Sequence, residues 1–316
     1  MRYQVRHETA YAYGSDVVHS HQLLHLVPRP SPFQECVEHS IEISPINYRR
    51  RDGADAFGNI VTRVELESPH RRLDVSAEME VEVHTRPAVS AADTDAWEQV
   101  RDSLSYKSGR WPSGEVLEAC RFRHESPYIR VKQAFDDYGA ECFEPGRPVL
   151  ACAEMLMQKI YRELRYSPGE TSVATPLSEV LENRRGVCQD FAHLMIACLR
   201  ARSLAARYVS GYIRLRPAVA SADCGEGDPA TLAVQPARSL EPQLDWVGAG
   251  ASHAWVAVYS PPFGWIELDP TNNVHVGTDH IGIAWGRDFG DVSPLRGVIL
   301  GGGSHTLSVS VTVEPL

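Results

Sequence analysis

The sequence lacks several features that define whole classes of protein. Its seven cysteines are an odd number with no close-spaced pair, so neither a disulfide framework nor a Cys-x-x-Cys zinc site is indicated. No stretch is long and apolar enough to span a bilayer, and the N-terminal segment has no apolar core of a signal peptide. No internal repeat is visible. We therefore expect a cytoplasmic protein, because a reducing compartment keeps thiols free.

Positive charge is also scarce. The chain has 31 Lys and Arg against 41 Asp and Glu, and its formal net charge is −10. Nucleic acid and anionic membrane surfaces repel such a chain, so we expect neither as a partner. With 316 residues the chain is long enough to bury a large core and to form two domains.

The pattern of apolar residues divides the chain into two parts. Residues 1–87 contain four stretches in which apolar and polar residues alternate, as in half-buried antiparallel strands, and we expect a β-rich, sandwich-like domain. Residues 88–316 contain helical patterns, followed by further strands from residue 205 onward. We expect this second part to be the catalytic domain. Within it, residues 217–245 are rich in Ala, Ser, Pro, Gly and acids, and we expect a surface loop that borders the substrate cleft.

One cysteine has a distinctive setting. Cys188 follows Gly186 in "GVCQDFAHL", where a loop ends and apolar residues begin to recur at helical spacing. The partial positive charge of a helix N-terminus favours a thiolate at this position. Gly186 is expected to allow unusual backbone geometry and to leave space beside the sulfur. By contrast, Cys152 and Cys198 lie on apolar helix faces and are expected in the core.

A histidine and an aspartate downstream suit this thiol. His253 begins the alternating stretch "HAWVAVYS", and Asp269 ends "GWIELD". The intervening "SPPFG" is short enough for a hairpin, so the two strands should be antiparallel neighbours with His253 beside Asp269. A thiol, an imidazole and a carboxylate are the parts of a nucleophilic acyl-transfer site.

These motifs together resemble the transglutaminase-like superfamily of cysteine acyl-transfer enzymes. "DAFGN" at residues 55–59 and "GRDFGDVSPLRGVILGGG" near the C-terminus extend the resemblance over most of the chain. It implies an α+β, papain-like core preceded by a β-sandwich. It also implies that Cys188 is the nucleophile, His253 the general base and acid, and Asp269 the orienting carboxylate. One departure is Ala257, where related proteins often carry an acidic residue.

The expected reaction is attack of the Cys188 thiolate on a carboxamide or peptide carbonyl, through a thioester. The substrate is then a peptide, a protein or a small amide, and the resemblance favours hydrolysis by an amidase or protease. Two alternatives remain: a transglutaminase that uses an amine acceptor, and a catalytically silent binding module. We expect no cofactor and no metal. The oligomeric state is left open by the sequence.

Residues close to the nucleophile have simpler interpretations. We expect Asp190 to pair with the backbone or with an arginine, and His193 to be structural. Arg184 and Arg185 are either solvated or one of them binds a substrate carboxylate.

Two further groups have both a structural and a functional interpretation. Trp255 and Trp265 are expected in the core, although an indole N–H near the sulfur would suit an oxyanion hole. His19, His21 and His25 share parity in a predicted strand, and a polar sheet face is favoured over a metal site because no acid is evident nearby. The triple glycine at 301–303 is predicted to be a turn.

Overall fold

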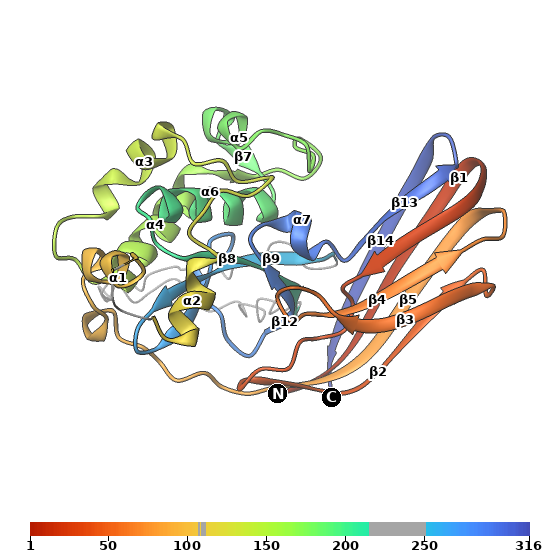
Figure 1. Ribbon diagram of the computed structural model, residues 1–316, viewed down its shortest axis with the longest axis horizontal. Helices are drawn as coiled ribbons and strands as arrows, with labels where there is room; N and C mark the ends of the chain where they lie inside the picture. Colours follow the sequence, from red (N-terminus) through yellow and green to blue (C-terminus); the bar gives the residue numbers. More distant parts are fainter. Residues whose placement is uncertain (107, 109–111, 215–250) are drawn as a thin grey trace, which may run out of the picture.

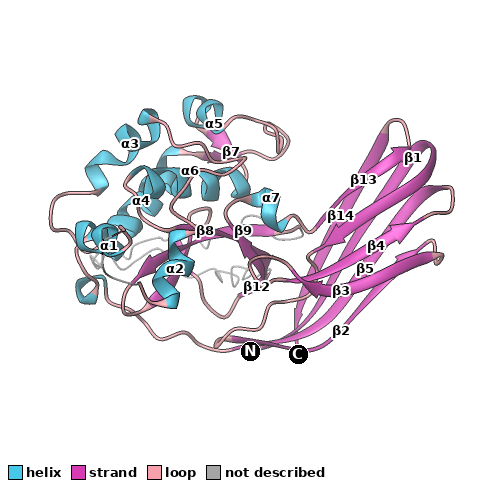
Figure 2. Cartoon of the chain, in the orientation of Figure 1, coloured by secondary structure: helices cyan, strands magenta, loops and turns pink. Residues whose placement is uncertain are grey.

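The computed structural model describes residues 1–106, 108, 112–214 and 251–316 (Figure 1). It has an elongated, entirely β-stranded part beside a mixed part in which helices cover a second sheet (Figure 2). The α+β class and the β-rich N-terminal region predicted above are confirmed. The predicted loop at 217–245 lies outside the described residues.

One long strand organises the β-rich part. Strand β1 (Arg2–Leu24) runs between β5 and β14 in its first half and between β4 and β13 in its second half. The seven strands thus form one continuous antiparallel sheet, in which five follow the path β2-β5-β1-β4-β3 and the other two, β13 and β14, pair with β1. The other strands are β2 (Gln34–Ser44), β3 (Tyr48–Ala54), β4 (Ile60–Leu66), β5 (His70–Val83), β13 (Leu295–Gly301) and β14 (His305–Pro315).

A register shift turns β1 over at its middle. In the first half Tyr3 and Val5 are buried, so odd-numbered residues face inward, whereas Gln22 and Leu24 are buried in the second half. The shift against β13 lies between Val17 and His19. Because side chains alternate along a strand, one inserted residue exchanges the two faces. The second half of β1 consequently presents its odd-numbered residues outward.

The C-terminal strands join the N-terminal sheet, which the sequence did not indicate. Strands β13 and β14 both pair with β1, although residues 88–316 were expected to belong together. The pairing is long-range in sequence and leaves no local trace in the composition. The division of the chain at residue 87 stays a prediction.

The second sheet carries the helices. It has the order β11-β10-β9-β8-β12 and is antiparallel throughout. Its strands are β8 (Ala206–Ile213), β9 (His253–Ser260), β10 (Gly264–Asp269), β11 (Val274–His275) and β12 (His280–Gly286). The helices are α1 (Trp97–Ser103), α2 (Gly114–Cys120), α3 (Gln133–Gly139), α4 (Val149–Glu163), α5 (Leu177–Asn183), α6 (Cys188–Ala201) and α7 (Phe289–Val292).

Helix α6 is the centre of this part. It lies against β8 and β9 on one side and against α3, α4 and α5 on the other. Twelve of its fourteen residues are buried, so it is a core helix rather than a surface helix with one buried face. Cys198 on α6 and Cys152 on α4 are buried, as predicted. In the described ranges no helix is both long and apolar enough to cross a membrane.

Two side-chain amides protect the free edge of β12. Asn59 bonds the backbone N–H and C=O of Trp285, and Gln34 does the same for Gly282. An exposed strand edge invites pairing with another chain, and these amides occupy it. Asn59 is the last residue of "DAFGN", whose Asp55 carboxylate accepts from the N–H of Asn59. That motif therefore joins the β-rich sheet to the sheet under α6.

Gly211 is required for space at the centre of β8. A Cβ atom there would lie 2.2 Å from the Ile281 carbonyl oxygen and 2.4 Å from the Trp255 ring. We predict that Gly211→Ala lowers the free energy of unfolding by about 3 kcal/mol, because overpacking forces the backbone of β12 away. Urea unfolding measures the loss. Gly277→Ala is the control, since a Cβ at Gly277 meets nothing within 4 Å; equal stability of the two variants would contradict this account.

Candidate active site

Cys188 is the first residue of α6. Its neighbour Val187 has extended backbone angles, so the helix begins at the thiol as predicted. The side chain is nearly buried, with 9% of the residue exposed, and Sγ lies 4.0 Å from the carbonyl oxygen of Ser252. The sulfur thus lies where the N-terminus of α6 meets the start of β9.

Asp190 holds the turn that leads into α6. Its carboxylate accepts from the backbone N–H of Val187 at 2.9 Å and from the hydroxyl of Thr171 at 2.7 Å. Burial raises the pKa of Asp190, and the two hydrogen bonds offset part of that rise. The predicted pairing of Asp190 with backbone is confirmed. This carboxylate fixes the backbone that carries the thiol.

The reason for Gly186 differs from the expectation. Its φ does not lie in the left-handed region, so the backbone conformation does not require glycine. A Cβ atom at Gly186 would instead lie 2.6 Å from Oδ2 of Asp190. The absent side chain of Gly186 therefore makes room for the Asp190 carboxylate, whereas room beside the sulfur was expected.

His253 and Asp269 form a buried pair across β9 and β10. The antiparallel register pairs Leu268 with Val256, which places the end of β10 near the start of β9, and His253 Nε2 lies 2.8 Å from Asp269 Oδ2. Burial alone lowers the pKa of His253, but the Asp269 carboxylate outweighs it and raises the pKa. Burial likewise raises the pKa of Asp269, and His253 and His280 more than reverse this. The pair is therefore an imidazolium and a carboxylate.

The other ring nitrogen of His253 is left for the sulfur. Nδ1 has no hydrogen-bond partner among the described residues, while Nε2 is engaged by Asp269. The charge of Cys188 also contributes to the raised pKa of His253, so the two side chains interact. The structure thus brings Cys188, His253 and Asp269 together from a helix start and two strands.

Asp269 is held by more donors than the sequence indicated. Its Oδ2 also accepts from Asn272 Nδ2 at 2.7 Å and faces His280 Nε2 at 3.2 Å, while Oδ1 accepts from the backbone N–H groups of Thr271 and Asn272. Asn272 lies in the "DPTN" that follows β10, so the motif itself held the signal. His280 begins β12 and is remote in the chain, and nothing local in the sequence pointed to it.

Trp255 is not available as an oxyanion donor. Its Nε1–H donates to Glu267 Oε2 at 2.7 Å, so the indole is already occupied. Burial raises the pKa of Glu267, but the charges of Arg86 and Arg207 outweigh burial, so the pKa is lowered overall. Nη1 of Arg86 lies 2.9 Å from Oε1 of Glu267. This buried charge network was missed, because it joins residues of four separate segments. Ala257, where an acid was expected by resemblance, pairs across the ladder with Glu267.

The remaining predicted residues have structural partners. Trp265 is partly buried and packs edge-on against Phe122 at the border of the core, where a fully buried position was expected. His193 accepts from the backbone N–H of Phe289 at 3.1 Å, and burial lowers its pKa to about 3, so it is neutral and structural as predicted. Arg184 pairs with Glu163 and Arg185 with Glu170.

Comparisons with known proteins cover both parts of the chain. Residues 3–82 match the family model of the bacterial transglutaminase-like N-terminal region, and residues 137–270 match that of the transglutaminase-like superfamily. An uncharacterized protein of Mycobacterium tuberculosis is 35% identical, over 99% of this chain and 93% of its own. One of Mycobacterium leprae is 31% identical, over 100% and 99%.

A solved structure has the same fold. It is a Cytophaga hutchinsonii protein, described as a "putative cysteine protease", which aligns with a TM-score of 0.69 and 20% identity over 99% of this chain and 90% of that one. The predicted fold class, with the thiol at a helix start and the histidine and aspartate on adjacent strands, is confirmed.

The Asp269 carboxylate controls the protonation of His253. We predict that Asp269→Asn lowers the pKa of His253 below that of a free imidazole, because burial, the largest single influence on the ring, is then opposed by Cys188 without the carboxylate. The ring should stay protonated through neutral pH in the wild type and become neutral in the variant, which 15N NMR of the imidazole measures directly. Asp74→Asn on β5, an exposed carboxylate, is the matched control and should leave the titration of His253 unchanged. Identical titration in Asp269→Asn and the wild type would refute the ion pair.

Proposed function

This chain belongs to the transglutaminase-like superfamily, and on that premise we propose that it is a cysteine-dependent acyl-transfer enzyme with Cys188, His253 and Asp269 as its catalytic triad. The observation that carries the proposal is the orientation of the His253 ring, in which the two nitrogens have different surroundings. Asp269 occupies Nε2 of the ring, and Nδ1 has no hydrogen-bond partner in the described part of the chain, although the ring is buried beside the thiol. An orphaned nitrogen there has a function if it exchanges a proton with sulfur and substrate.

Acylation uses these groups in a fixed order. The Cys188 thiolate attacks the carbonyl carbon of an amide, and the carbonyl electron pair moves onto oxygen. The first N–H groups of α6 have no intrahelical acceptor, and those at Cys188 would stabilise the oxyanion. When the intermediate collapses, the C–N bond breaks and the proton on His253 passes to the departing amine. A thioester on Cys188 remains.

The second half-reaction determines the class of enzyme. Water, deprotonated by His253, would attack the thioester and release a carboxylic acid, which makes the protein an amidase or protease. We propose this hydrolytic outcome, with a peptide, a protein or a small amide as substrate. The cysteine protease description of the Cytophaga hutchinsonii protein supports it by analogy of fold. An amine acceptor would make the protein a transglutaminase by the same steps.

Asp269 supports both half-reactions without contacting substrate. It is completely buried and receives hydrogen bonds from the backbone of Thr271 and Asn272, which keeps it ionised. An ionised carboxylate stabilises the imidazolium of His253 and holds Nδ1 toward the reacting atoms. Asn272 and His280, which contact the same carboxylate oxygen, act as positioning residues in this scheme.

Trapping of the acyl-enzyme tests the proposal. We expect a peptide and carboxamide library to leave an acyl group on Cys188, detectable by mass spectrometry of the acid-quenched protein. Cys188→Ala should lose the adduct and at least about 10⁴-fold of the turnover, as expected when a nucleophile is removed. Cys36→Ser is the matched control, since Cys36 is a half-buried thiol on β2 far along the chain.

A labelled primary amine added to the same reactions separates the alternatives. Release of the free acid despite the amine supports hydrolysis, whereas incorporation of the amine into product indicates a transglutaminase. Brief iodoacetamide treatment should label Cys188 ahead of the other thiols. Retained turnover in Cys188→Ala would exclude the mechanism, and thiols that all react equally slowly would indicate a binding module.

A further inference from the structure

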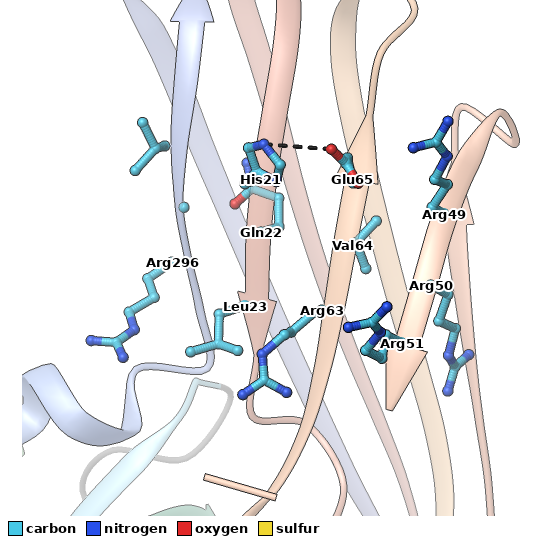
Figure 3. A pocket seen from close by; sticks show the side chains of 12 residues that line it. His21, Gln22, Leu23, Arg49, Arg50, Arg51, Arg63, Val64, Glu65 and Arg296 are labelled. Atoms are coloured by element: carbon cyan, nitrogen blue, oxygen red, sulfur yellow. Dashed lines mark ion pairs between the residues drawn. The ribbon is translucent and has the colours of Figure 1, made fainter. Parts of the chain in front are cut away.

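A second cluster of reactive side chains, His19, His21 and Glu65, lies on the β-rich sheet. Figure 3 shows two of them, His21 and Glu65, facing one another from neighbouring strands. His19 and His21 are two residues apart on β1 and therefore share a face. The register shift after Val17 turns this face outward. Glu65 on β4 is the direct ladder partner of His21, so its side chain lies on the same face. The strand register therefore places the side chains of His19, His21 and Glu65 on one face of the sheet.

The ligand atoms of the three side chains converge. His19 Nε2 lies 2.7 Å from His21 Nε2, and Glu65 Oε1 lies 3.6 Å from His21 Nε2 and 3.9 Å from His19 Nε2. The two rings meet at 69°, so they point toward one another and do not stack. Around a tetrahedral zinc with bonds of ~2.0–2.1 Å, neighbouring ligand atoms are about 3.3 Å apart. The three observed separations bracket that value.

Ordinary hydrogen bonding accounts for only part of this arrangement. One imidazole can donate to the other at 2.7 Å, but the carboxylate is too distant from either nitrogen for a hydrogen bond. Arg49 is the ladder partner of Glu65 on β3, yet its guanidinium pairs with Glu67 at 3.3 Å. Among the described residues, Glu65 has no ion-pair partner other than these two histidines. A cation between the three groups would satisfy all of them.

We propose that His19, His21 and Glu65 bind a divalent transition metal of the zinc class. Two imidazoles and one carboxylate suit Zn²⁺, Co²⁺ or Ni²⁺, whereas Ca²⁺ and Mg²⁺ prefer oxygen ligands alone. His25, which shares parity with the other two histidines in the sequence, is not part of the site. It is buried, and its Nδ1 lies 3.1 Å from the Ser293 carbonyl oxygen.

Three protein ligands leave one coordination position open. It borders a groove of about 890 Å³ that His21, Glu65, Arg51, Arg63 and Arg296 help to line (Figure 3). Arg51 and Arg63 are ladder partners, and no carboxylate of the described residues forms an ion pair with either, so their charges add. These guanidinium groups favour an anionic fourth ligand, such as a carboxylate or phosphate, over water alone. The metal would also link β1 to β4.

Metal titration of the full chain tests the site. Cys188 is first alkylated with iodoacetamide so that the thiol does not compete. Isothermal titration with Zn²⁺ should give one equivalent, and Co²⁺ should give a d–d spectrum without a thiolate charge-transfer band. His19→Ala and His21→Ala should each weaken binding at least ~100-fold, and Glu65→Gln ~10-fold, because even outer partners of a metal contribute that much.

His84→Ala is the matched control, since His84 is a half-exposed histidine elsewhere in the chain and should leave the affinity unchanged. All variants should share the thermal midpoint of the wild type in EDTA, and zinc should raise the midpoint only in the wild type and the control. Binding that survives loss of both histidines, or a wild-type dissociation constant weaker than ~1 mM, would overturn the proposal.

Discussion

The buried ion pair between His253 and Asp269 is the constraint on which the arrangement of the mixed part depends. Both side chains are removed from water, and a charge in that position is costly unless it is paired and fully hydrogen-bonded. Asp269 meets that demand with two backbone N–H groups and with Asn272 and His280. Thr271 and Asn272 lie in the turn after β10, and His280 begins the edge strand β12, so both the turn and β12 must be in place before the pair is stable.

The same logic extends to a second buried charge nearby. Glu267 lies two residues before Asp269 on β10 and is paired with Arg86 and, through longer-range charge, with Arg207. It accepts from the indole of Trp255, which stands between the two networks and contacts His280 edge-on. Strand β10 thus carries two buried carboxylates. Asp269 belongs to the network of the proposed chemistry, and Glu267 belongs to a network that stabilises the sheet. Removing one member of either ion pair would leave the other as an uncompensated buried charge. The short hydrogen bonds around Asp269 and Glu267 follow from this requirement.

The β-rich sheet supports this part from the side. Asn59 and Gln34 pair with the edge of β12, the strand that carries His280 at its start. Because β13 and β14 complete the same sheet around β1, the chain closes on itself, and its two ends lie together (Figure 1). The family match over residues 3–82 and 137–270 therefore describes two regions that the C-terminal strands tie into one structure.

The local parts of the site were readable in the sequence. Two patterns placed the triad: the helical spacing after Cys188, and the hairpin between the strands of His253 and Asp269. Both depend on residues close together in the sequence, so they can be recognised without the tertiary structure. Asp190 could be assigned to the backbone for the same reason, since a carboxylate in the first turn of a helix finds N–H groups close by.

What only the tertiary structure decided involves residues far apart in the chain. His280 reaches Asp269 because β12 crosses to pair with β8. Glu267 accepts the hydrogen bond of the Trp255 indole, which the sequence analysis had considered as an oxyanion donor. Glu65 reaches His19 and His21 through the pairing of β4 with β1, which converts a histidine-rich strand into a cluster with an acid. The periodicity of one strand says which side chains share a face, but the register against a distant strand determines what they meet.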